Sequence, residues 1–476
     1  MSRIYNKSVE YFANNPEKIF FYDLKQSLSG RICLDVINQI NEYLSSRKIQ
    51  TIALGPKNTI YWPLWYIAAD KLCNYIYMFN QRQNPEQAEH LMEKYNIQCY
   101  VSNPSGLKNN CIESLDRSKE INKSLIKPDC KRADILFTTG TTGLPKGVII
   151  EESAYIHVVK CLIKKLKQNQ NHLELLSMPF SHSFGLARLR CVLMTGGSAV
   201  ITDGLKNFPE IYKFSKSTRI SGLSLVPAAI EIIKKLLKSK IEQFSKNIDY
   251  MELGSSAISG EVRKWLRDHF HDTKIIHHYG MTEASRAFIR ERGQRDDFNS
   301  PNNWIGDPLD GCDYSINKND LQEYGYGELR LKGLNLFQGY LDTGQLTNKD
   351  KNGWLKTGDL CKVKNSKVLL IGRVDNQLNV GGEKFQSEEI EQAIENIEGV
   401  KICVTFSIPD EILGNKIACI INTNSDASSS IIKKRIRKTL SIFSINSKNC
   451  LIKFTLSNLL TKNGKKIRRP NILLNK

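Results

Sequence analysis

Strand-like apolar runs alternate with helix-like segments from the N-terminus to Tyr279. The runs IQTIALG and NIQCYVS have the composition of buried strands, whereas CLDVINQINEYL carries apolar residues at helical spacing. The alternation continues with ADILFTT, SGLSLV, DYMELG and TKIIHHYG, and each of these runs ends in a polar or glycine-rich turn. This pattern predicts an α/β fold built around parallel sheets, with ligands gathered where the strands end.

The C-terminal third has a different texture. Residues 300–372 hold short apolar runs separated by glycines and turn dipeptides, as in GYGELRLKGLNLFQGY and NGWLKTGD, which predict a β-rich subdomain. The helix-forming SEEIEQAIENI and the strand-like KICVTFSI and KIACIINT follow. A chain of 476 residues exceeds what one hydrophobic core usually serves. We expect a large N-terminal domain of two α/β sheet subdomains plus the β-rich subdomain, residues 1–374, and a small C-terminal α/β domain, residues 375–476.

Composition places the chain among ordinary soluble globular proteins, with 41% apolar and 25% charged residues. No apolar run approaches the roughly 20 residues that span a bilayer, and no signal-peptide pattern opens the chain, so a cytoplasmic protein without a transmembrane segment is expected. The twelve cysteines are scattered singly from Cys33 to Cys450. That spacing favours buried thiols over disulfides or a zinc site.

Positive charge is concentrated at the C-terminal end. The net charge is +19, and the stretch from Ala427 to Lys476 contributes thirteen basic residues and no acidic one. Such a block attracts phosphates. Its densest part, KKRIRK at residues 433–438, suits nucleic acid, an acidic protein, a membrane surface or a phosphorylated cofactor, and it equally suits a solvated helix face.

The segment LFTTGTTGLPKGVII, residues 136–150, places four threonines, three glycines and one lysine between two apolar runs. Glycines let backbone N–H groups approach an anion closely, threonine hydroxyls add donors, and Lys146 adds positive charge. A phosphate-binding loop is therefore predicted. It lacks the Walker spacing, and a glycine-rich hairpin with incidental hydroxyls is the alternative.

FTTGTTGLPKGV resembles the phosphate loop of the adenylate-forming superfamily, which includes acyl-CoA synthetases, adenylation domains of peptide synthetases and beetle luciferases. Similar motifs follow in the order of that superfamily: MPFSHSFGL, LGSSAIS, YGMTEAS, GELRLKGLNLFQGY, GWLKTGDL, GRVDNQLNVGGEKFQSEEIE and LTKNGKK. The resemblance covers residues 134–469, and the first 130 residues match only in general pattern. It implies an enzyme that joins a carboxylic acid to ATP as acyl-adenylate, releases pyrophosphate, and then passes the acyl group to a thiol.

The resemblance also implies the residues of the ATP site. The β- and γ-phosphates would be bound by Thr138, Thr139, Gly140, Thr141, Thr142, Gly143 and Lys146. Adenine would be bound by Gly254, Ser255, Ser256 and Tyr279. Thr282 would contact the α-phosphate, and Glu283 would bind Mg²⁺, which prefers oxygen ligands. Asp359 would accept hydrogen bonds from the ribose hydroxyls, with Arg373 nearby as a donor.

Three further segments are implied to act on the acid and the thiol. Lys465 would stabilise the charge that develops between carboxylate and α-phosphate, although the adjacent Lys466 is an alternative. Asp375 matches a hinge about which the small domain rotates, so that domain is expected to be mobile. Gly381 and Gly382 would let the pantetheine arm of CoA pass close to the backbone, and an acyl carrier protein is the alternative acceptor.

The acid-pocket segment carries His182 where amino-acid-activating members usually present an aspartate, which favours a simple carboxylic acid. His182 would line or gate the pocket, or it is a satisfied core residue. The chain also departs from the family pattern, with Ser387 at a usual proline, Asn379 at a frequent lysine, and His277 and His278 where a small residue is common. An inactive nucleotide-binding or nucleic-acid-binding protein is the remote alternative, and no nucleic-acid partner is expected.

Overall fold

The computed structural model describes residues 3–80, 85–104, 132–139, 145–254, 258, 260–292, 301, 303–317, 321, 325–341, 349–380, 383–410, 414–423, 429–443, 445, 450–460 and 466–467. These residues form two compact units. Unit 1 comprises residues 1–313 and 331–355, and unit 2 comprises residues 314–330 and 356–476. No helix in the described ranges is long and apolar enough to cross a membrane.

Unit 1 contains a nine-stranded sheet. Its strands are, in spatial order, β14 (Asp307–Pro308), β13 (Ala284–Arg292), β12 (Lys274–Met281), β11 (Tyr250–Leu253), β10 (Gly222–Leu225), β8 (Leu173–Leu176), β9 (Ser198–Ile201), β1 (Ile19–Tyr22) and β2 (Ser27–Ser29). The run from β12 to β1 is parallel, and β13, β14 and β2 are antiparallel additions at the two edges. The carboxyl ends of the parallel strands therefore meet at one edge of the sheet.

A six-stranded sheet forms the other layer of unit 1. Its strands are, in spatial order, β17 (Gly339–Tyr340), β7 (Pro145–Glu151), β6 (Ala133–Thr139), β4 (Tyr75–Met78), β3 (Thr51–Leu54) and β5 (Cys99–Val101). The strands from β6 to β5 are parallel, as the alternating pattern predicts, while β7 and β17 are antiparallel.

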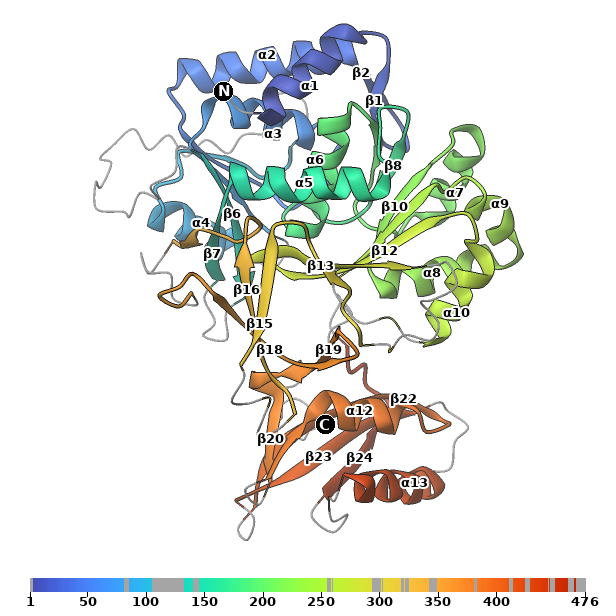
Figure 1. Cartoon of the computed structure of the whole chain (residues 1–476). Coiled ribbons are helices and arrows are strands. Elements are labelled where there is room, and N and C mark those ends of the chain that lie inside the picture. Colours follow the sequence, from blue (N-terminus) through green and yellow to red (C-terminus); the bar gives the residue numbers. More distant parts are fainter. Residues whose placement is uncertain are drawn as a thin grey trace. The chain divides into compact units, whose positions relative to one another are not determined.

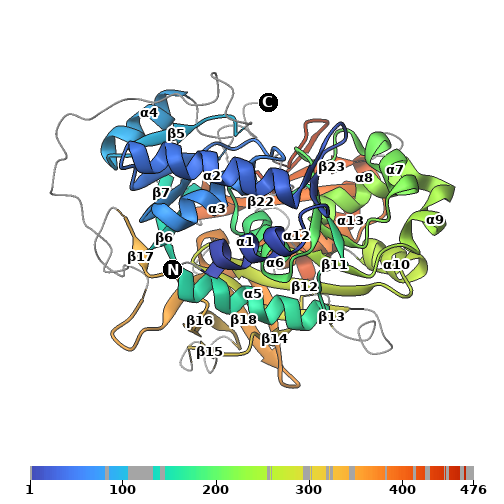
Figure 2. The same ribbon diagram turned by 90° about the horizontal axis from the view of Figure 1, so that it is seen from above.

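Helices cover both sheets. The helices of unit 1 are α1 (Arg3–Asn14), α2 (Gly30–Ser46), α3 (Trp62–Leu72), α4 (Pro85–Lys94), α5 (Glu152–Leu166), α6 (Ser183–Thr195), α7 (Phe208–Ser217), α8 (Pro227–Leu237), η1 (Lys238–Lys240), α9 (Ile241–Ser245) and α10 (Gly260–His269). Helices α1, α2 and α3 contact one another and lie side by side in Figure 2. Helix α5 contacts both β7 and β13, so it packs between the two sheets.

The two faces of the nine-stranded sheet pack against different helices, because successive side chains of a strand point to opposite faces. On one face Leu175, Leu223 and Met251 join the apolar core under α7, α8 and α10, which lie together beside β10 and β12 in Figure 1. On the other face the polar neighbours Glu174 and Glu252 point toward α6. Strands that alternate apolar and polar residues usually turn the polar face to solvent. Here that polar face is buried and carries charged side chains.

Unit 2 holds most of a four-stranded sheet, a two-stranded sheet and a three-stranded sheet. Their strands are β15 (Cys312–Ile316), β16 (Gly327–Gly333), β18 (Leu355–Lys364) and β19 (Lys367–Arg373), then β20 (Gln377–Val380) and β21 (Glu383–Gln386), and finally β22 (Val400–Asp410), β23 (Gly414–Thr423) and β24 (Cys450–Thr455). Its helical elements are η2 (Val374–Asn376), α12 (Ser387–Glu395) and α13 (Ser429–Ile442). Ile390, Ile394, Ile417, Ile436 and their neighbours form its apolar core.

The observed architecture confirms the mixed α/β fold and the elements expected from the sequence. The domain boundary between residues 374 and 375 remains a prediction, because the division into two compact units does not identify the residue about which a domain rotates. The strands β16, β18 and β19 of the β-rich stretch lie wholly or mostly in unit 2. The ten described cysteines are all free, as predicted, and most are buried. The basic KKRIRK segment lies on α13, with Lys434, Arg435, Arg437 and Lys438 exposed.

Candidate active site

The predicted phosphate loop joins two paired strands. β6 and β7 are antiparallel neighbours, with Thr138 opposite Lys146 and Phe137 opposite Gly147. The strands therefore form a hairpin, and Thr138 and Lys146 lie side by side near the end at which residues 140–144 connect them. A Cβ at Gly147 would lie 2.6 Å from Leu341 Cδ1, so this glycine permits close packing of β7. Gly140, Thr141, Thr142 and Gly143 lie outside the described residues, as does the side chain of Thr139.

Thr282 and Glu283 form the turn of a second hairpin. β12 and β13 pair antiparallel up to Met281 opposite Ala284, and the two residues between these partners make the connection. Glu283 is buried at 8% exposure. Its backbone oxygen accepts a hydrogen bond from Phe337 N at 2.9 Å, which fixes the turn against the segment before β17.

Tyr340 connects the two hairpins, and the sequence reasoning assigned it no role. It lies on β17, which pairs with β7 through Tyr340 opposite Val148. Its hydroxyl donates to Glu283 Oε1 at 2.8 Å, and Lys146 Nζ lies 5.7 Å from the centre of its ring. Burial, and then the charge of Glu283, raise the pKa of Tyr340, so the phenol stays protonated and keeps donating. The lysine of the phosphate loop and the predicted magnesium ligand are thereby brought together.

Glu283 fits the predicted magnesium ligand. Its Oε1 accepts the hydrogen bond of the Tyr340 hydroxyl, which orients the carboxylate. The described part of the chain contains no group of three or more His, Cys, Asp or Glu that could hold a metal ion. Mg²⁺ is commonly bound through one or two carboxylates, with phosphate oxygens and water completing the set. One carboxylate, oriented by the tyrosine whose ring also lies near Lys146, suits that requirement.

The predicted adenine segment ends β11 beside β12. Gly254 follows β11, and a Cβ there would lie 2.1 Å from His278 Cε1, so only glycine fits against this imidazole. Tyr279, next along β12, is half-buried, and its ring meets Phe288 edge-on at 5.9 Å. Ser255 and Ser256 lie outside the described residues.

A buried charge cluster lies under these residues. It consists of Glu174, Arg188, Glu252, His278 and Arg286, whose side chains are at most 8% exposed. Arg188 Nε donates to Glu174 Oε1 at 2.8 Å, and its Nη1 lies 3.3 Å from Glu252 Oε2. Arg286 Nε donates to Glu252 Oε1 at 3.0 Å, and His278 Nδ1 lies 2.7 Å from the same oxygen. Two arginines thus balance two carboxylates.

The cluster also positions the start of α6. Arg286 Nη1 donates to Ser183 O at 2.9 Å and Nη2 donates to Phe184 O at 3.1 Å. The backbone of Arg286 has φ of 53°, a left-handed conformation that is uncommon for arginine. The hydrogen bonds of its side chain hold the residue in this conformation. Burial opposes ionisation of Glu252, but Arg286 and His278 hold its pKa below the usual range. Burial and Arg286 lower the pKa of His278, so its imidazole is neutral at pH 7.

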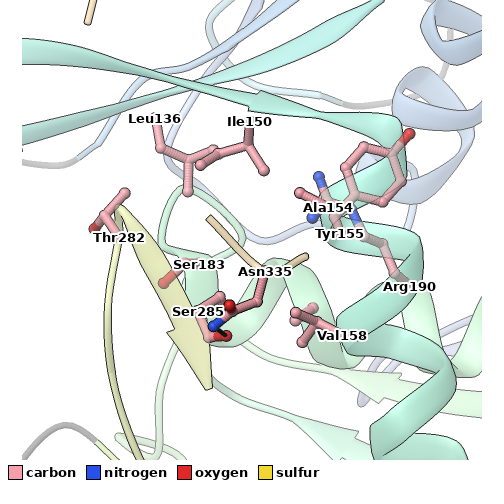
Figure 3. A pocket seen from close by; sticks show the side chains of 11 residues that line it. Leu136, Ile150, Ala154, Tyr155, Val158, Ser183, Arg190, Thr282, Ser285 and Asn335 are labelled. Atoms are coloured by element: carbon pink, nitrogen blue, oxygen red, sulfur yellow. Dashed lines mark hydrogen bonds between the residues drawn. The ribbon is translucent and has the colours of Figure 1, made fainter. Parts of the chain in front are cut away.

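A small pocket opens beside Thr282. Its walls come from β6, β7, α5 and α6, together with Thr282, Ser285 and Asn335 (Figure 3). Thr282 and Ser183 lie on one side, and Tyr155 and Val158 lie on the other. Arg190 lines the pocket, but it pairs with Asp134 and donates to the hydroxyl of Tyr66, so its charge is already compensated. The walls of this small pocket are mainly apolar.

His182 precedes the first residue of α6 and has extended backbone angles, φ −115° and ψ 147°. It makes no side-chain cap, and its carbonyl accepts from Leu186 N at 3.0 Å. The histidine is half-buried at the carboxyl end of the parallel strands, next to Ser183 of the pocket. This location agrees with a residue that lines the acid site.

Asp359 and Arg373 are brought together within unit 2. They face each other on the antiparallel strands β18 and β19, and Arg373 Nη1 donates to Asp359 Oδ1 at 2.7 Å. Asp359 is mostly buried at 12% side-chain exposure, whereas Arg373 is 42% exposed and also lies 3.5 Å from Asp375 Oδ2. The arginine therefore orients a carboxylate at the strand end, as residues that bind vicinal hydroxyls require.

Ser387, which departs from the family pattern, is accommodated at the start of α12. It is the first residue of α12, a place that proline favours because its N–H would be unsatisfied. The Ser387 hydroxyl instead donates to Asn376 O at 2.7 Å and ties the helix to η2. His277, another departure, has Nδ1 3.1 Å from Arg292 Nη2. Gly381, Gly382 and Lys465 lie outside the described residues.

Comparison with known proteins adds three likenesses. The sequence model of a family described as AMP-binding enzyme matches residues 9–341. The chain is 26% identical over 405 residues to a 2-succinylbenzoate–CoA ligase of Haemophilus influenzae, covering 83% of this chain and 82% of the relative. It is 25% identical over 334 residues to a putative long chain fatty acid–CoA ligase of Staphylococcus haemolyticus, covering 69% and 68%.

A solved structure shares the fold. It is the o-succinylbenzoate CoA synthetase of Bacillus subtilis in complex with its acyl-adenylate intermediate, which matches with a TM-score of 0.78 over 97% of each chain at 17% sequence identity.

Proposed function

The chain belongs to the AMP-binding enzyme family, and from that premise we propose that it is an AMP-forming acid:CoA ligase. The substrate carboxylate attacks the α-phosphate of ATP, pyrophosphate leaves, and the thiol of CoA then displaces AMP from the acyl-adenylate. The observation that carries this proposal is the connection from Lys146 through Tyr340 to Glu283, because it joins a phosphate loop to a metal-binding carboxylate beside Thr282.

The described residues suit different parts of the first half-reaction. Thr138 and Lys146 face the β- and γ-phosphates, and the hydroxyl of Thr282 donates to the α-phosphate. Glu283 would hold Mg²⁺, which would neutralise charge on the leaving pyrophosphate. Fixed donors and cations stabilise the charge that gathers during attack without reorganising at the moment of reaction. Asp359, oriented by Arg373, binds the ribose, and Lys465 supplies the cation between carboxylate and α-phosphate.

The acid is proposed to be a simple carboxylic acid. His182 stands where amino-acid-activating members usually present an aspartate, and the small pocket beside Thr282 offers apolar and hydroxyl groups. The relatives' names cover an aromatic acid and a long-chain fatty acid, so both acid classes belong in the substrate panel.

A pantetheinylated acyl carrier protein is the second candidate acceptor. The exposed cations of α13 would bind the phosphates of CoA or the acidic surface of such a carrier. The two acceptors share the same thiol chemistry, so they are separated only by assay.

Pyrophosphate release with ATP and Mg²⁺ tests the proposal, measured over fatty, aryl and amino acids with and without CoA. We expect release that depends on one class of acid and rises with CoA, together with formation of AMP and a thioester. Lys465→Ala, which removes the proposed catalytic cation, serves as the negative control and should still bind ATP. Acid-dependent release that ignores CoA would assign the carrier protein as acceptor, and silence across the panel would contradict a ligase for these acid classes.

A further inference from the structure

Helix α13 has one buried face and one exposed face. The buried face packs into the apolar core of unit 2, next to β24 in Figure 1, through Ile432, Ile436 and Leu440. The exposed face carries four cations, Lys434, Arg435, Arg437 and Lys438. The sequence of the helix contains no acidic residue, so every charge that the helix itself carries is positive.

Two isoleucines lie on the same exposed face. Ile431 is 56% exposed and Ile442 is 78% exposed, although both are large apolar side chains. They begin and end a line of residues that share one side of the helix, because the members are spaced by four, three and four positions: Ile431, Arg435, Lys438 and Ile442. The exposed line is therefore apolar at its two ends and cationic between them.

The cations are available to an anionic partner. Arg435 Nη1 lies 3.6 Å from Glu398 Oε2, but the two side chains are 51% and 91% exposed. Exposed pairs of this kind contribute little, so another anion can replace Glu398. The sequence from Ala427 to Lys476 adds to the attraction, since it holds thirteen basic residues and no acidic one.

The isoleucines distinguish among the anionic partners that the cations alone would suit. Nucleic acid and CoA offer phosphates to the cations, but they offer no apolar medium to Ile431 and Ile442. An acidic protein would need an apolar groove shaped to an exposed helix. A bilayer offers anionic headgroups and, just beneath them, acyl chains, and it does so along the whole length of a helix that lies flat on it.

We propose that α13 docks the protein on the surface of an anionic lipid bilayer, with its cations among the headgroups and with Ile431 and Ile442 inserted between them. The inference is independent of the proposed reaction, since neither ATP nor the acid takes part in docking. Clusters of four or more Lys or Arg on an amphipathic helix are typical of binding to anionic lipids. Two isoleucines bury little area, so docking is reversible and requires the cations as well.

Co-sedimentation of the full chain with lipid vesicles tests the proposal. Vesicles of phosphatidylcholine alone are compared with vesicles that also contain about 30% phosphatidylglycerol. We expect binding to the anionic vesicles only. The affinity should fall at least about tenfold when the ionic strength rises from about 0.1 M to about 0.5 M, because salt screens the attraction.

A variant without the exposed cations should lose most of the binding. It combines Lys434→Gln, Arg435→Gln, Arg437→Gln and Lys438→Gln. Each cation near an anionic surface contributes roughly a fivefold factor, so the vesicle affinity should fall at least about 100-fold. The matched control removes the same charge from exposed lysines of unit 1, through Lys160→Gln, Lys206→Gln, Lys213→Gln and Lys235→Gln. Charges outside the docking helix act only through screened attraction, so the control should lose less than about threefold.

A second variant tests insertion of the apolar side chains. Ile431→Ser combined with Ile442→Ser keeps every cation and should lower the affinity for anionic vesicles roughly tenfold, because less apolar area is buried. Its control is Ile232→Ser combined with Leu236→Ser on α8, where the two side chains are 44% and 48% exposed. This control should stay within about twofold of the wild type.

All the substituted side chains are exposed or partly exposed, so each variant should fold, which thermal denaturation verifies. Equal binding to neutral and anionic vesicles, or an equal loss in the two charge variants, would overturn the docking role of α13. Full vesicle affinity after loss of both isoleucines would overturn insertion into the bilayer. Binding of the wild type to an acidic carrier protein or to RNA, without binding to vesicles, would assign this face to a soluble anion and refute the proposal.

Discussion

Two groups of charged side chains in this protein differ in their exposure to solvent. The cluster of Glu174, Arg188, Glu252, His278 and Arg286 in unit 1 is closed, because each charge is buried and compensated by its neighbours. The pair of Asp359 and Arg373 in unit 2 is half open, since the arginine is 42% exposed. The closed assembly is suited to hold a scaffold, whereas the open pair can take an additional partner. We propose that charged side chains serve structure in the first cluster and ligand binding in the second pair.

Removing one member of the closed cluster should have the largest effect. Arg286→Met leaves Glu252 without its closest guanidinium and frees the carbonyls of Ser183 and Phe184. Breaking a buried pair in this way costs about 3–5 kcal/mol of unfolding free energy, which urea denaturation of the full chain would report. A loss below about 1 kcal/mol would mean that the cluster is not a structural element.

Asp359→Asn should produce the opposite result: ATP binding should weaken, while the free energy of unfolding should change little. The free energy of unfolding should change by less than about 1 kcal/mol, because the pair is partly exposed. The KM for ATP should rise about 10- to 100-fold, the value of a hydrogen bond to a charged group. Isothermal titration with ATP would check this, and an unchanged affinity would remove Asp359 from the nucleotide site.

Tyr340→Phe tests an interaction of intermediate kind, the hydrogen bond from a neutral phenol to the buried carboxylate of Glu283. The variant loses the hydrogen bond to Glu283 but keeps the ring that faces Lys146. We expect a roughly tenfold fall in the rate of pyrophosphate release, measured at several Mg²⁺ concentrations, with little change in thermal stability. An unaltered magnesium dependence would separate Tyr340 from the metal site.

The smallest expected effect is a dependence of stability on pH. His278 is packed against Glu252, Arg286 and Arg188, and its folded-state pKa lies below the usual value near 6.5. A group of this kind contributes stability that is complete above pH 6.5 and declines as the pH falls toward the folded pKa. The urea midpoint should therefore drop between pH 7 and pH 5, and it should drop less in His278→Gln. Equal slopes in both proteins would contradict a neutral imidazole in the folded state.

Local patterns were sufficient to predict the parts of the site that are continuous in sequence. Short motifs predicted the strand β6 and named Thr282, Glu283, Asp359 and Arg373 as separate site residues. The hairpin that carries Thr282 and Glu283, and the pairing of Asp359 with Arg373, are seen only in the structure. The closed cluster could not be predicted, because Glu174 and Glu252 meet only through the strand order β11-β10-β8. Tyr340 was present in a recognised motif, but its function depends on how β17 pairs with β7. Non-local pairing, which no short pattern encodes, accounts for what was missed.

The contact between Gly254 and His278 also bears on how the predicted adenine segment could be altered by directed evolution. A Cβ at position 254 would lie 2.1 Å from the imidazole of His278. The side chain at position 254 therefore cannot be enlarged unless the side chain at position 278 moves or shrinks. Any larger residue at 254 requires a smaller one at 278, so single-site libraries at 254 would sample mostly misfolded proteins. A paired library that varies both codons together is the accessible route from this sequence to larger side chains at position 254.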